Sequence, residues 1–375
     1  MIAPSISRYL QSRVDAGDFP SAVYLAAEKG EVKFEDALGY AVVEPERIEA
    51  RVDTIYDLAS VTKVLVTALL AAKLIEDGRL RLDAPISQYL DSHELGDKAS
   101  ISIKQLFTHS TDLPGWIPFY LQVAERTEIL FEIVRTPFNA DRGLVVYGDP
   151  NFWLITFILE RIFGEPIDVT ARRLIIEPLG LKDTFFTPPD ALKRRVAASE
   201  KGTNFERQLC RDLGYDFTIN RITGEVPFRD DVIWNEVHDQ NAYFFGSVGG
   251  HAGLFSTAAD VLTMAKQFLP NSTRLLKPET CELFTTNLTA GRNEDRSFGF
   301  ELASSPDSTA GSKMSPQSFG HLGFTGTSLW IDPVKERVFI LLTNRTHDHD
   351  LPLVNMNPIR RQFHNLAIDA LDADL

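Results

Sequence analysis

The order of strand-like and helix-like patterns along the chain constrains its fold more than any other feature. Near the N-terminus, residues 22–28 and 32–41 flank Lys29-Gly30 and predict a β-hairpin that follows an amphipathic helix over residues 5–16. Toward the C-terminus, residues 298–302, 319–331 and 338–343 predict further strands, and residues 358–371 predict a closing helix. The long stretch between these two groups is mainly helix and loop.

Strands at both ends of a helical middle predict a mixed α/β (α+β) fold, with an antiparallel sheet flanked by helices. We expect one domain over residues 1–375, with an α/β lobe from about 1–58 and 290–375 and a helical lobe over about 59–289. With 375 residues and 44% hydrophobic content, the chain can bury a large core. A polar segment over residues 200–234 is expected to shape the entrance to a cleft between the lobes.

The stretch Ser60-Val61-Thr62-Lys63 begins an apolar helical pattern that ends at Asp77-Gly78. Ser60 and Lys63 therefore share one face of a first helical turn. A serine hydroxyl needs a neighbouring base to become a good nucleophile, and a lysine can act so when its neutral form is favoured. Free amides at the helix start could stabilise an oxyanion. Taken alone, the pattern also fits a helix-capping serine followed by a solvated lysine.

Two later segments carry further candidate residues. Tyr147, in Tyr147-Gly148-Asp149, follows an apolar run and precedes a helical stretch over 153–162. A phenol there could carry protons between nucleophile and leaving group, or it could be an interior tyrosine bonded at a turn. The glycine-rich segment 319–330 would let a substrate backbone approach closely, and an amide beyond Gly323 could complete an oxyanion hole.

In this order and spacing, the three segments resemble the signatures of the penicillin-recognising serine hydrolases. This family includes class C β-lactamases, low-molecular-weight D-alanyl-D-alanine peptidases and the esterases that share their fold. The resemblance covers nearly the whole chain, because segments 106–114, 178–184, 237–243 and 249–257 are also similar to family motifs.

The resemblance implies roles for the matched residues. Ser60 would be acylated, and Lys63 and Tyr147 would share the base and acid duties as a coupled pair whose true base stays open. The amides of Ser60 and Phe324 would form the oxyanion hole. His321 would take the place of the third motif's lysine or histidine, unless it is a strand histidine satisfied by a neighbour. The family-like segments also contain His109, His238 and His251, which we expect to hold loops.

The chain departs from the family pattern at several positions. Asp149 stands where many relatives have asparagine, and a carboxylate cannot donate the hydrogen bond that an amide offers a substrate. Leu322 replaces a threonine and Phe324 follows the motif's glycine, so two hydroxyls that could bind a carboxylate are missing. These changes argue against tight binding of penicillins or free D-alanine carboxyl termini. Asp112 replaces a glycine, a change that the sequence does not explain.

The sequence therefore predicts a serine hydrolase that cleaves an amide or ester through a Ser60 acyl-enzyme. The β-lactamase-like and D-alanyl-D-alanine carboxypeptidase-like activities are the first expectation, and a carboxylesterase acting on small esters is the alternative. A protein of another class also fits, namely a sensor or binding protein that is acylated once or not at all. The expected substrate-binding positions are His321, Gly323, Phe324 and Asp149.

Composition limits the partners of such a protein. The formal charge of −14 disfavours nucleic acid and anionic membranes, and we expect a small-molecule or peptide-like acyl substrate. No apolar run reaches the ~20 residues of a membrane span, and no export signal is visible, so a cytoplasmic location is the default expectation. A periplasmic or secreted location is the alternative if an export signal has been removed. The oligomeric state is not predicted. Cys210 and Cys281 lack metal-binding spacing, as does the run 347–350, and no metal or organic cofactor is expected.

Overall fold

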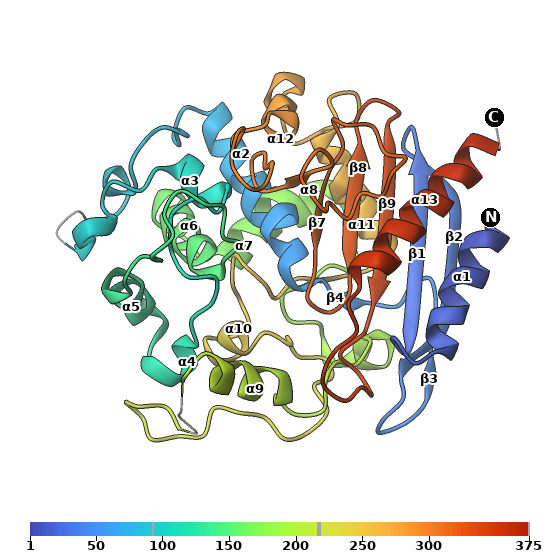
Figure 1. Ribbon diagram of the computed structural model, residues 1–375, viewed down its shortest axis with the longest axis horizontal. Coiled ribbons are helices and arrows are strands. Elements are labelled where there is room, and N and C mark those ends of the chain that lie inside the picture. Colours follow the sequence, from blue (N-terminus) through green and yellow to red (C-terminus); the bar gives the residue numbers. More distant parts are fainter. Residues whose placement is uncertain (92–93, 216–218, 374–375) are drawn as a thin grey trace.

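The computed structural model describes residues 1–91, 94–215 and 219–373, and its centre is a seven-stranded antiparallel sheet (Figure 1). The strand order is β3-β2-β1-β9-β8-β7-β6. The strands are β1 Ser21–Glu28, β2 Glu31–Val42, β3 Ile48–Glu49, β6 Glu301–Leu302, β7 Phe319–Leu322, β8 Ser328–Asp332 and β9 Arg337–Thr343. The first hairpin pairs directly with the C-terminal strands, because β1 runs antiparallel to β9 from Ala22 opposite Thr343 to Glu28 opposite Arg337. The predicted α/β fold with an antiparallel sheet is thus confirmed.

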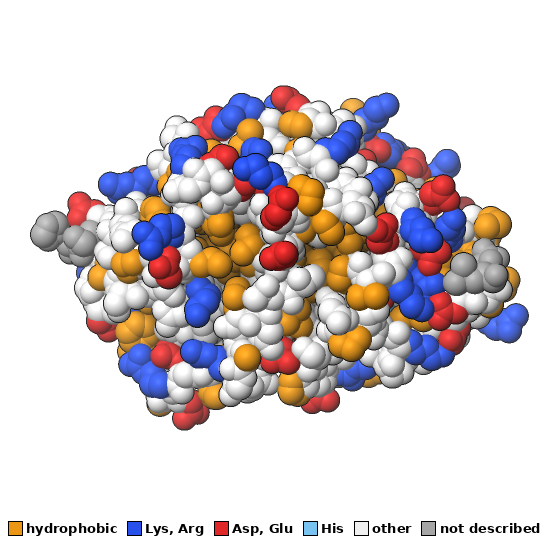
Figure 2. Space-filling view, turned by 90° about the horizontal axis from the view of Figure 1, so that it is seen from above, with side chains coloured by type: hydrophobic (Ala, Val, Ile, Leu, Met, Phe, Trp, Pro, Cys, Tyr) orange, Lys and Arg blue, Asp and Glu red, His pale blue; other side chains and the backbone are white. Residues whose placement is uncertain are grey.

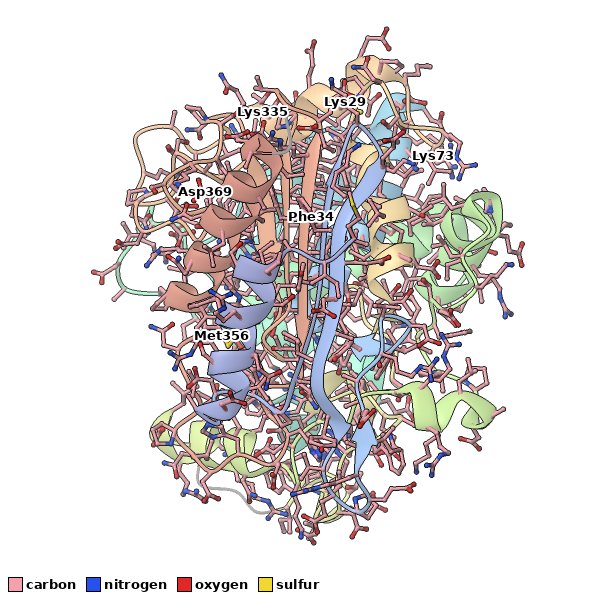
Figure 3. All side chains as sticks on the ribbon, turned by 90° about the vertical axis from the view of Figure 1, so that its right-hand side faces the viewer. Lys29, Phe34, Lys73, Lys335, Met356 and Asp369 are labelled. Carbon is pink, nitrogen blue, oxygen red and sulfur yellow. The ribbon has the colours of Figure 1, made fainter. Side chains whose placement is uncertain are left out.

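Helices α1 Pro4–Asp15 and α13 Asn357–Ala373 contact each other and cover one side of the sheet (Figures 1 and 3). Strand side chains alternate between the two sides, so each central strand contributes to two cores. Tyr24, Trp330 and Phe339 pack with these two helices, whereas their neighbours Leu25 and Ile340 face the larger core on the other side. Strands buried on both sides explain the nearly continuous apolar runs in β1, β8 and β9.

The opposite side of the sheet carries the remaining helices and a small second sheet. The helices are α2 Leu69–Glu76, α3 Ile103–Phe107, α4 Phe119–Gln122, α5 Ile129–Arg135, α6 Asp149–Phe163, α7 Ile167–Ala171, α8 Glu177–Leu179, α9 Asn204–Asp212, α10 Gln240–Phe244, α11 Ala258–Ala265 and α12 Glu282–Thr285. The two-stranded sheet pairs β4 Tyr56–Asp57 with β5 Phe255–Ser256. Part of the expected entrance segment, residues 216–218, lies outside the described residues.

The prediction of one continuous strand over residues 319–331 is wrong, because β7 ends at Leu322 and β8 begins at Ser328. A tight turn joins them, closed by the Gly323 amide, which donates to the Thr327 carbonyl at 2.9 Å. Gly326 adopts φ +102°, a conformation that side chains disfavour. A Cβ on Gly323 would lie 2.5 Å from the Leu58 carbonyl oxygen, so glycine allows this turn to press against the chain just before Ser60. The strand expected over 298–302 is likewise shorter, comprising only β6.

The helix expected from Ser60 to Asp77 is present but irregular. It begins with a 3-10 turn over Ala59–Val61, continues as a π-helical segment over Lys63–Ala68 and becomes regular in α2. The π-helical segment is buried throughout, so its backbone geometry is set by packing in the core. Ser60 and Lys63 remain in the first turns of this element, as the sequence predicts.

The surface carries charges of both signs. On the side shown in Figure 2, Lys and Arg side chains alternate with Asp and Glu side chains around a group of hydrophobic side chains. No basic band crosses this side of the molecule, in keeping with the formal charge of −14. Within the described ranges, the structure contains no helix that is long and apolar enough to span a membrane.

Candidate active site

Ser60 and Lys63 contact each other at the start of the irregular helix. The Lys63 ammonium Nζ lies 2.9 Å from Ser60 Oγ. It also donates to Asp149 Oδ1 at 2.7 Å and to the His251 carbonyl at 2.9 Å, and the Lys63 side chain is fully buried. A lysine ammonium has three N–H groups, and these three acceptors use all of them. Lys63 is therefore fixed in one position beside the serine hydroxyl.

The protonation of Lys63 is governed by Asp149. Burial alone would lower the pKa of Lys63, but the charge of Asp149, with contributions from Tyr147 and from hydrogen bonding, raises this pKa above its ordinary value. The resting state thus has a lysine ammonium paired with an aspartate. In this geometry, loss of one proton from Lys63 would leave a lone pair that could accept the Ser60 hydroxyl hydrogen.

Tyr147 lies on the other side of Lys63, with its ring centroid 5.2 Å from Nζ. Its ring also contacts those of His109, at 4.4 Å between centroids, and His321, at 5.7 Å. His109 fixes the loop, because its Nδ1 accepts a hydrogen bond from the Gly148 amide at 3.1 Å. The tyrosine hydroxyl group therefore belongs to the same cluster as Ser60 and Lys63, which are 87 and 84 positions earlier in the chain.

Asp149, Asp239 and His251 form a compact group next to Lys63. Their potential ligand atoms all lie within 4.8 Å of one another, a spacing that could hold a metal ion. The Lys63 ammonium, however, already pairs with Asp149, and His251 Nε2 lies 3.1 Å from Asp239 Oδ1. Although burial opposes ionisation, the charge and hydrogen bond of His251 lower the pKa of Asp239 to about 2. Lys63 thus supplies the positive charge that this carboxylate group requires.

The backbone around Ser60 is held by buried hydrogen bonds. The Asp57 carboxylate accepts from the Ala59 amide at 2.8 Å and from the His238 amide at 2.8 Å. Burial raises the pKa of Asp57, and the two amide bonds oppose this increase. Ala59 has φ +46°, in the left-handed region that a non-glycine residue rarely adopts, immediately before Ser60.

Two backbone amides lie free near the serine. In the described part of the chain, neither the Ser60 nor the Phe324 amide donates to a protein acceptor. The turn that contains Phe324 is fixed to the segment before Ser60, because the Thr327 hydroxyl donates to the Leu58 carbonyl at 3.2 Å. The Thr325 hydroxyl similarly donates to the Asp57 carbonyl at 2.8 Å. These contacts give the two amides a fixed relative position.

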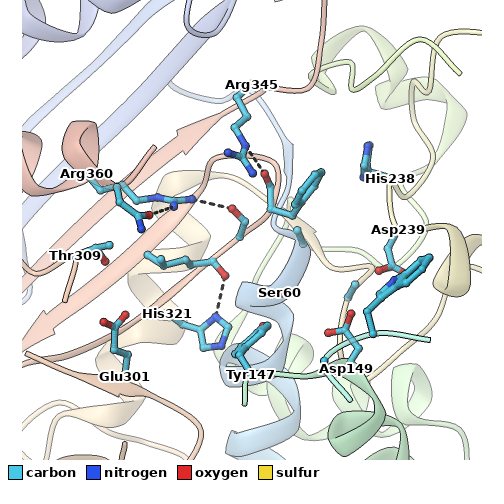
Figure 4. A pocket seen from close by; sticks show the side chains of 18 of the residues that line it. Ser60, Tyr147, Asp149, His238, Asp239, Glu301, Thr309, His321, Arg345 and Arg360 are labelled. Atoms are coloured by element: carbon cyan, nitrogen blue, oxygen red, sulfur yellow. Dashed lines mark hydrogen bonds between the residues drawn. The ribbon is translucent and has the colours of Figure 1, made fainter. Parts of the chain in front are cut away.

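These groups border one cavity of about 690 Å³ (Figure 4). Ser60 and Tyr147 lie near its centre, with Asp149 and Asp239 to one side. On the other side, His321, Glu301, Thr309 and Arg360 surround a second part of the cavity. The nucleophile candidate therefore lies between two differently built walls, the arrangement that a substrate with an acyl part and a leaving group requires.

His321 presents a neutral ring to this cavity. Its Nδ1 lies 2.9 Å from the Leu322 carbonyl oxygen, which can only accept, so the proton is on Nδ1. The pKa of His321 is held well below its ordinary value by burial and by the positive charges of Lys63 and Arg296. Its Nε2 atom, in a side chain that is 3% exposed, has no hydrogen-bond partner among the described residues.

Two arginines hold the turn between β7 and β8 from behind. Arg360, near the start of α13, donates from Nη2 to the Gly323 and Thr327 carbonyls at 2.8 and 2.9 Å. Arg345 donates to the Phe324 carbonyl at 2.6 Å, and its guanidinium lies 4.9 Å from the Phe324 ring centroid. Burial lowers the pKa of Arg360 to about 9. Both arginines contribute to the cavity wall.

The structure brings every expected site residue to the cavity or directly beside it: Ser60, Lys63, Tyr147, Asp149, His321, Gly323 and Phe324. The three histidines that the sequence predicts to hold loops contact neighbouring segments. His109 binds Gly148, His238 binds Glu200 at 3.0 Å and His251 binds Asp239. Sequence reasoning missed the ion pair of Lys63 with Asp149, and also Asp239, Glu301 and Arg360. Asp239 lies inside a family-like segment, a signal that could have identified it.

Asp112, the glycine replacement without an explanation at the sequence level, adopts φ +64°. This conformation is the one in which glycine is favoured, and aspartate is among the residues that tolerate it. Its carboxylate accepts from the Gly143 amide at 2.7 Å. The replacement is therefore compatible with the same backbone and ties it to the loop before Tyr147.

The chain is similar in sequence and in fold to known proteins. The family model described as Beta-lactamase matches residues 6–357. An Escherichia coli K12 protein named "Putative D-alanyl-D-alanine carboxypeptidase" is 30% identical over 376 residues, covering 91% of this chain and 82% of that protein. The chain has the fold of a class C β-lactamase from Rhodobacter sphaeroides, with TM-score 0.71, 18% identity and coverage of 98% and 100% of the two chains. It also has the fold of EstCE1, a hydrolase with promiscuous acyltransferase activity, with TM-score 0.71, 20% identity and coverage of 96% and 97%.

Proposed function

The chain belongs to the Beta-lactamase family of serine hydrolases, and on this premise we propose that Ser60 is the nucleophile of an acyl-transfer reaction. The observation that carries the proposal is the 2.9 Å contact of Ser60 Oγ with Lys63 Nζ, which is buried and donates three hydrogen bonds. An ordinary helix-capping serine followed by a solvated lysine would leave that lysine exposed. Ser60 attacks an ester or amide carbonyl and becomes acylated, and water then releases the acid.

Lys63 and Tyr147 move the protons in both steps. Removal of the Ser60 proton requires a base within hydrogen-bond reach, and the Lys63 amine fulfils this condition once the Lys63 and Tyr147 pair has lost a proton. Tyr147, on the cavity side of Lys63, is placed to pass a proton to the leaving group.

The Ser60 and Phe324 amides form the oxyanion hole. Both are free of protein acceptors among the described residues, and the turn containing Phe324 is tied to the backbone before Ser60. Preorganised amides of this kind stabilise the negative charge that develops on the carbonyl oxygen during attack. The β7–β8 turn therefore contributes to catalysis through its backbone amide.

The substrate is a small-molecule or peptide-like acyl compound. The Escherichia coli relative carries the name of a D-alanyl-D-alanine carboxypeptidase, which favours an amide of that type. The cavity favours an ester or another amide as a second candidate, since the third motif here offers Leu322 and Phe324 in place of hydroxyls and a neutral His321 in place of a cation. A free carboxylate on the leaving group would find few donors there.

Burst kinetics with p-nitrophenyl acetate and nitrocefin, run beside intact-mass spectrometry, test this proposal. The protein should gain one acyl group and turn over, whereas Ser60→Ala should show neither the adduct nor turnover while retaining its circular dichroism spectrum and melting temperature. A Ser60→Ala variant with unchanged turnover would remove Ser60 from the mechanism. A stable adduct without product release would instead identify an acylable sensor, in which the ammonium state of Lys63 prevents deacylation.

A further inference from the structure

The wall of the cavity beyond Tyr147 contains an unused hydrogen-bond acceptor. His321 carries its proton on Nδ1, because that atom faces the Leu322 carbonyl at 2.9 Å, so Nε2 offers a lone pair. Nε2 is buried and lacks a partner among the described residues. A buried acceptor without a donor is unfavourable unless a ligand supplies the donor. His321 Nε2 is therefore an acceptor to which no described residue donates a hydrogen bond.

The neighbouring groups on this wall make it unsuited to an anion. Glu301 lies on β6 opposite Gly320, the residue before His321, and its side chain faces the cavity (Figure 4). Burial raises the pKa of Glu301 to about 7. The cation next to it, Arg296, is already bound by Glu294 at 2.8 Å. A carboxylate placed here would meet Glu301 and Glu294, and among the described residues the cavity lining contains no lysine.

Arg360 is the cationic residue of this wall that could bind an anionic leaving group. Its Nη2 is committed to two backbone carbonyls and its Nη1 donates to Asn357 Oδ1 at 3.2 Å. Only Nε lacks a partner among the described residues. Arg360 is thus mainly a clamp for the Gly323 and Thr327 carbonyls, and its remaining N–H can donate to a neutral oxygen as well as to a carboxylate.

We propose that this wall recognises a leaving group carrying a hydrogen-bond donor, an ammonium or a hydroxyl, through His321 Nε2 with the support of Glu301. This inference rests on the proposed function, because it assigns the wall to the leaving group of a Ser60 acyl transfer. His321 then acts as a specificity-determining acceptor. The protein discriminates by a bond that an apolar or anionic leaving group cannot make, and such sites reject the analogue lacking the donor.

Acetate esters with matched alcohols isolate this effect. All of them form the same acetyl-enzyme, so differences in kcat/KM report the leaving-group wall alone. The pair 2-(dimethylamino)ethyl acetate and 3-methylbutyl acetate has the same shape, but only the first carries an N–H donor when protonated. Acetylcholine adds a cation without a donor, and 3-acetoxypropanoate adds a carboxylate. Each kcat/KM is divided by the rate of uncatalysed hydrolysis of the same ester at the pH of the assay to remove intrinsic reactivity.

We expect the dimethylammonium ester to exceed the 3-methylbutyl ester by about tenfold or more, the range of one hydrogen bond involving a charged group. The kcat/KM of acetylcholine should fall between these two values, because its cation keeps the attraction to Glu301 but lacks the N–H. His321→Phe keeps a ring and removes the acceptor, so the ratio should fall toward one. Glu301→Gln should reduce it less. Glu31→Gln is the matched control, because this exposed carboxylate of β2 lies outside the cavity lining, and its ratio should stay unchanged.

Three results would overturn the inference. One is a higher kcat/KM of the wild-type protein for 3-acetoxypropanoate than for the other esters, which would identify Arg360 as a carboxylate anchor. This comparison uses the wild-type protein alone. Another is an equal loss of kcat/KM for every ester in His321→Phe, which would make His321 a positioning residue for Tyr147. The third is equal wild-type rates for the matched pair. Failure of the underlying acyl transfer is recognised separately, as the absence of an acetyl adduct on Ser60 with p-nitrophenyl acetate.

Discussion

Replacing Asp149 by asparagine isolates the charge that controls Lys63. The amide side chain of the Asp149→Asn variant would keep an oxygen near the position that accepts from Nζ at 2.7 Å, but it would remove the negative charge. Burial of Lys63 then acts without its main opposing interaction. The pKa of Lys63 should fall, so Lys63 should lose its proton at a lower pH. The acidic limb of the kcat/KM profile should move in the same direction.

The geometry sets the size of this shift. An opposite charge within about 4–6 Å changes a pKa by about 1–3 units, and Asp149 lies closer than this while its side chain is only 16% exposed. One pKa unit corresponds to about 1.4 kcal/mol, so Asp149 stabilises the Lys63 ammonium by about 1.4–4 kcal/mol relative to the neutral amine. We therefore expect the acidic limb of Asp149→Asn to lie about 1–3 pH units below that of the wild type.

Stopped-flow acylation by p-nitrophenyl acetate, measured from about pH 5 to about pH 10, provides the profile. Glu31→Gln serves as the control, because this variant removes an exposed carboxylate of β2 that lies outside the cavity lining. Its limb should coincide with that of the wild type. An Asp149→Asn limb that stays in place, or moves to higher pH, would show that the ammonium of Lys63 does not limit acylation. The assigned role of the ion pair would then be wrong.

Two further changes test the hydroxyl and the turn. Tyr147→Phe should slow acylation or deacylation by about 10²–10⁴, the range of general acid–base catalysis, in single-turnover assays, and an unchanged rate would remove Tyr147 from the mechanism. Gly323→Ala should destabilise the protein by about 1–3 kcal/mol in urea unfolding, because the new Cβ would lie 1.9 Å from Thr327 Oγ1 and 2.5 Å from the Leu58 carbonyl. Gly78→Ala, at a positive φ but with open space around the Cβ, is the comparison that separates backbone strain from this clash, and equal losses would contradict the packing argument.

The ends of the chain were predictable because their patterns are local. The hairpin over residues 22–41 consists of two strand-like segments joined by Lys29-Gly30, and the two terminal helices begin and end within about two residues of the expected positions. The segment 319–331 is wrongly predicted as one strand because its apolar residues continue on both sides of the turn. The chain reverses there through the Gly323–Thr327 hydrogen bond and the positive φ of Gly326, and the turn packs closely against Leu58, more than 260 positions earlier in the sequence.

The candidate site shows the same division between local and distant information. The spacing of Ser60 and Lys63 within one helical turn indicates their contact directly. The resemblance to a family adds Tyr147 and the β7–β8 turn. Neither source indicates that Asp149 pairs with Lys63 rather than with a substrate, since this depends on how the start of α6 is oriented toward the irregular helix. The tautomer of His321 likewise depends on the backbone carbonyl that its ring meets.

The two departures from the family pattern act together on the charge of the cavity. Asp149 neutralises Lys63, and His321 contributes no positive charge, so neither motif position offers a free cation to a substrate. The guanidiniums that line the described cavity donate to backbone carbonyls or to Glu294. Burial raises the pKa of Glu301 to about 7 and that of Glu206 to about 8, so these two carboxyl groups are not fully ionised near neutral pH. A carboxylate on the substrate would find no free cation at the two motif positions, whereas a neutral group needs none. The oxyanion formed during attack would then be the main negative charge that the site stabilises. This accords with an ester or amide whose leaving group carries no carboxylate.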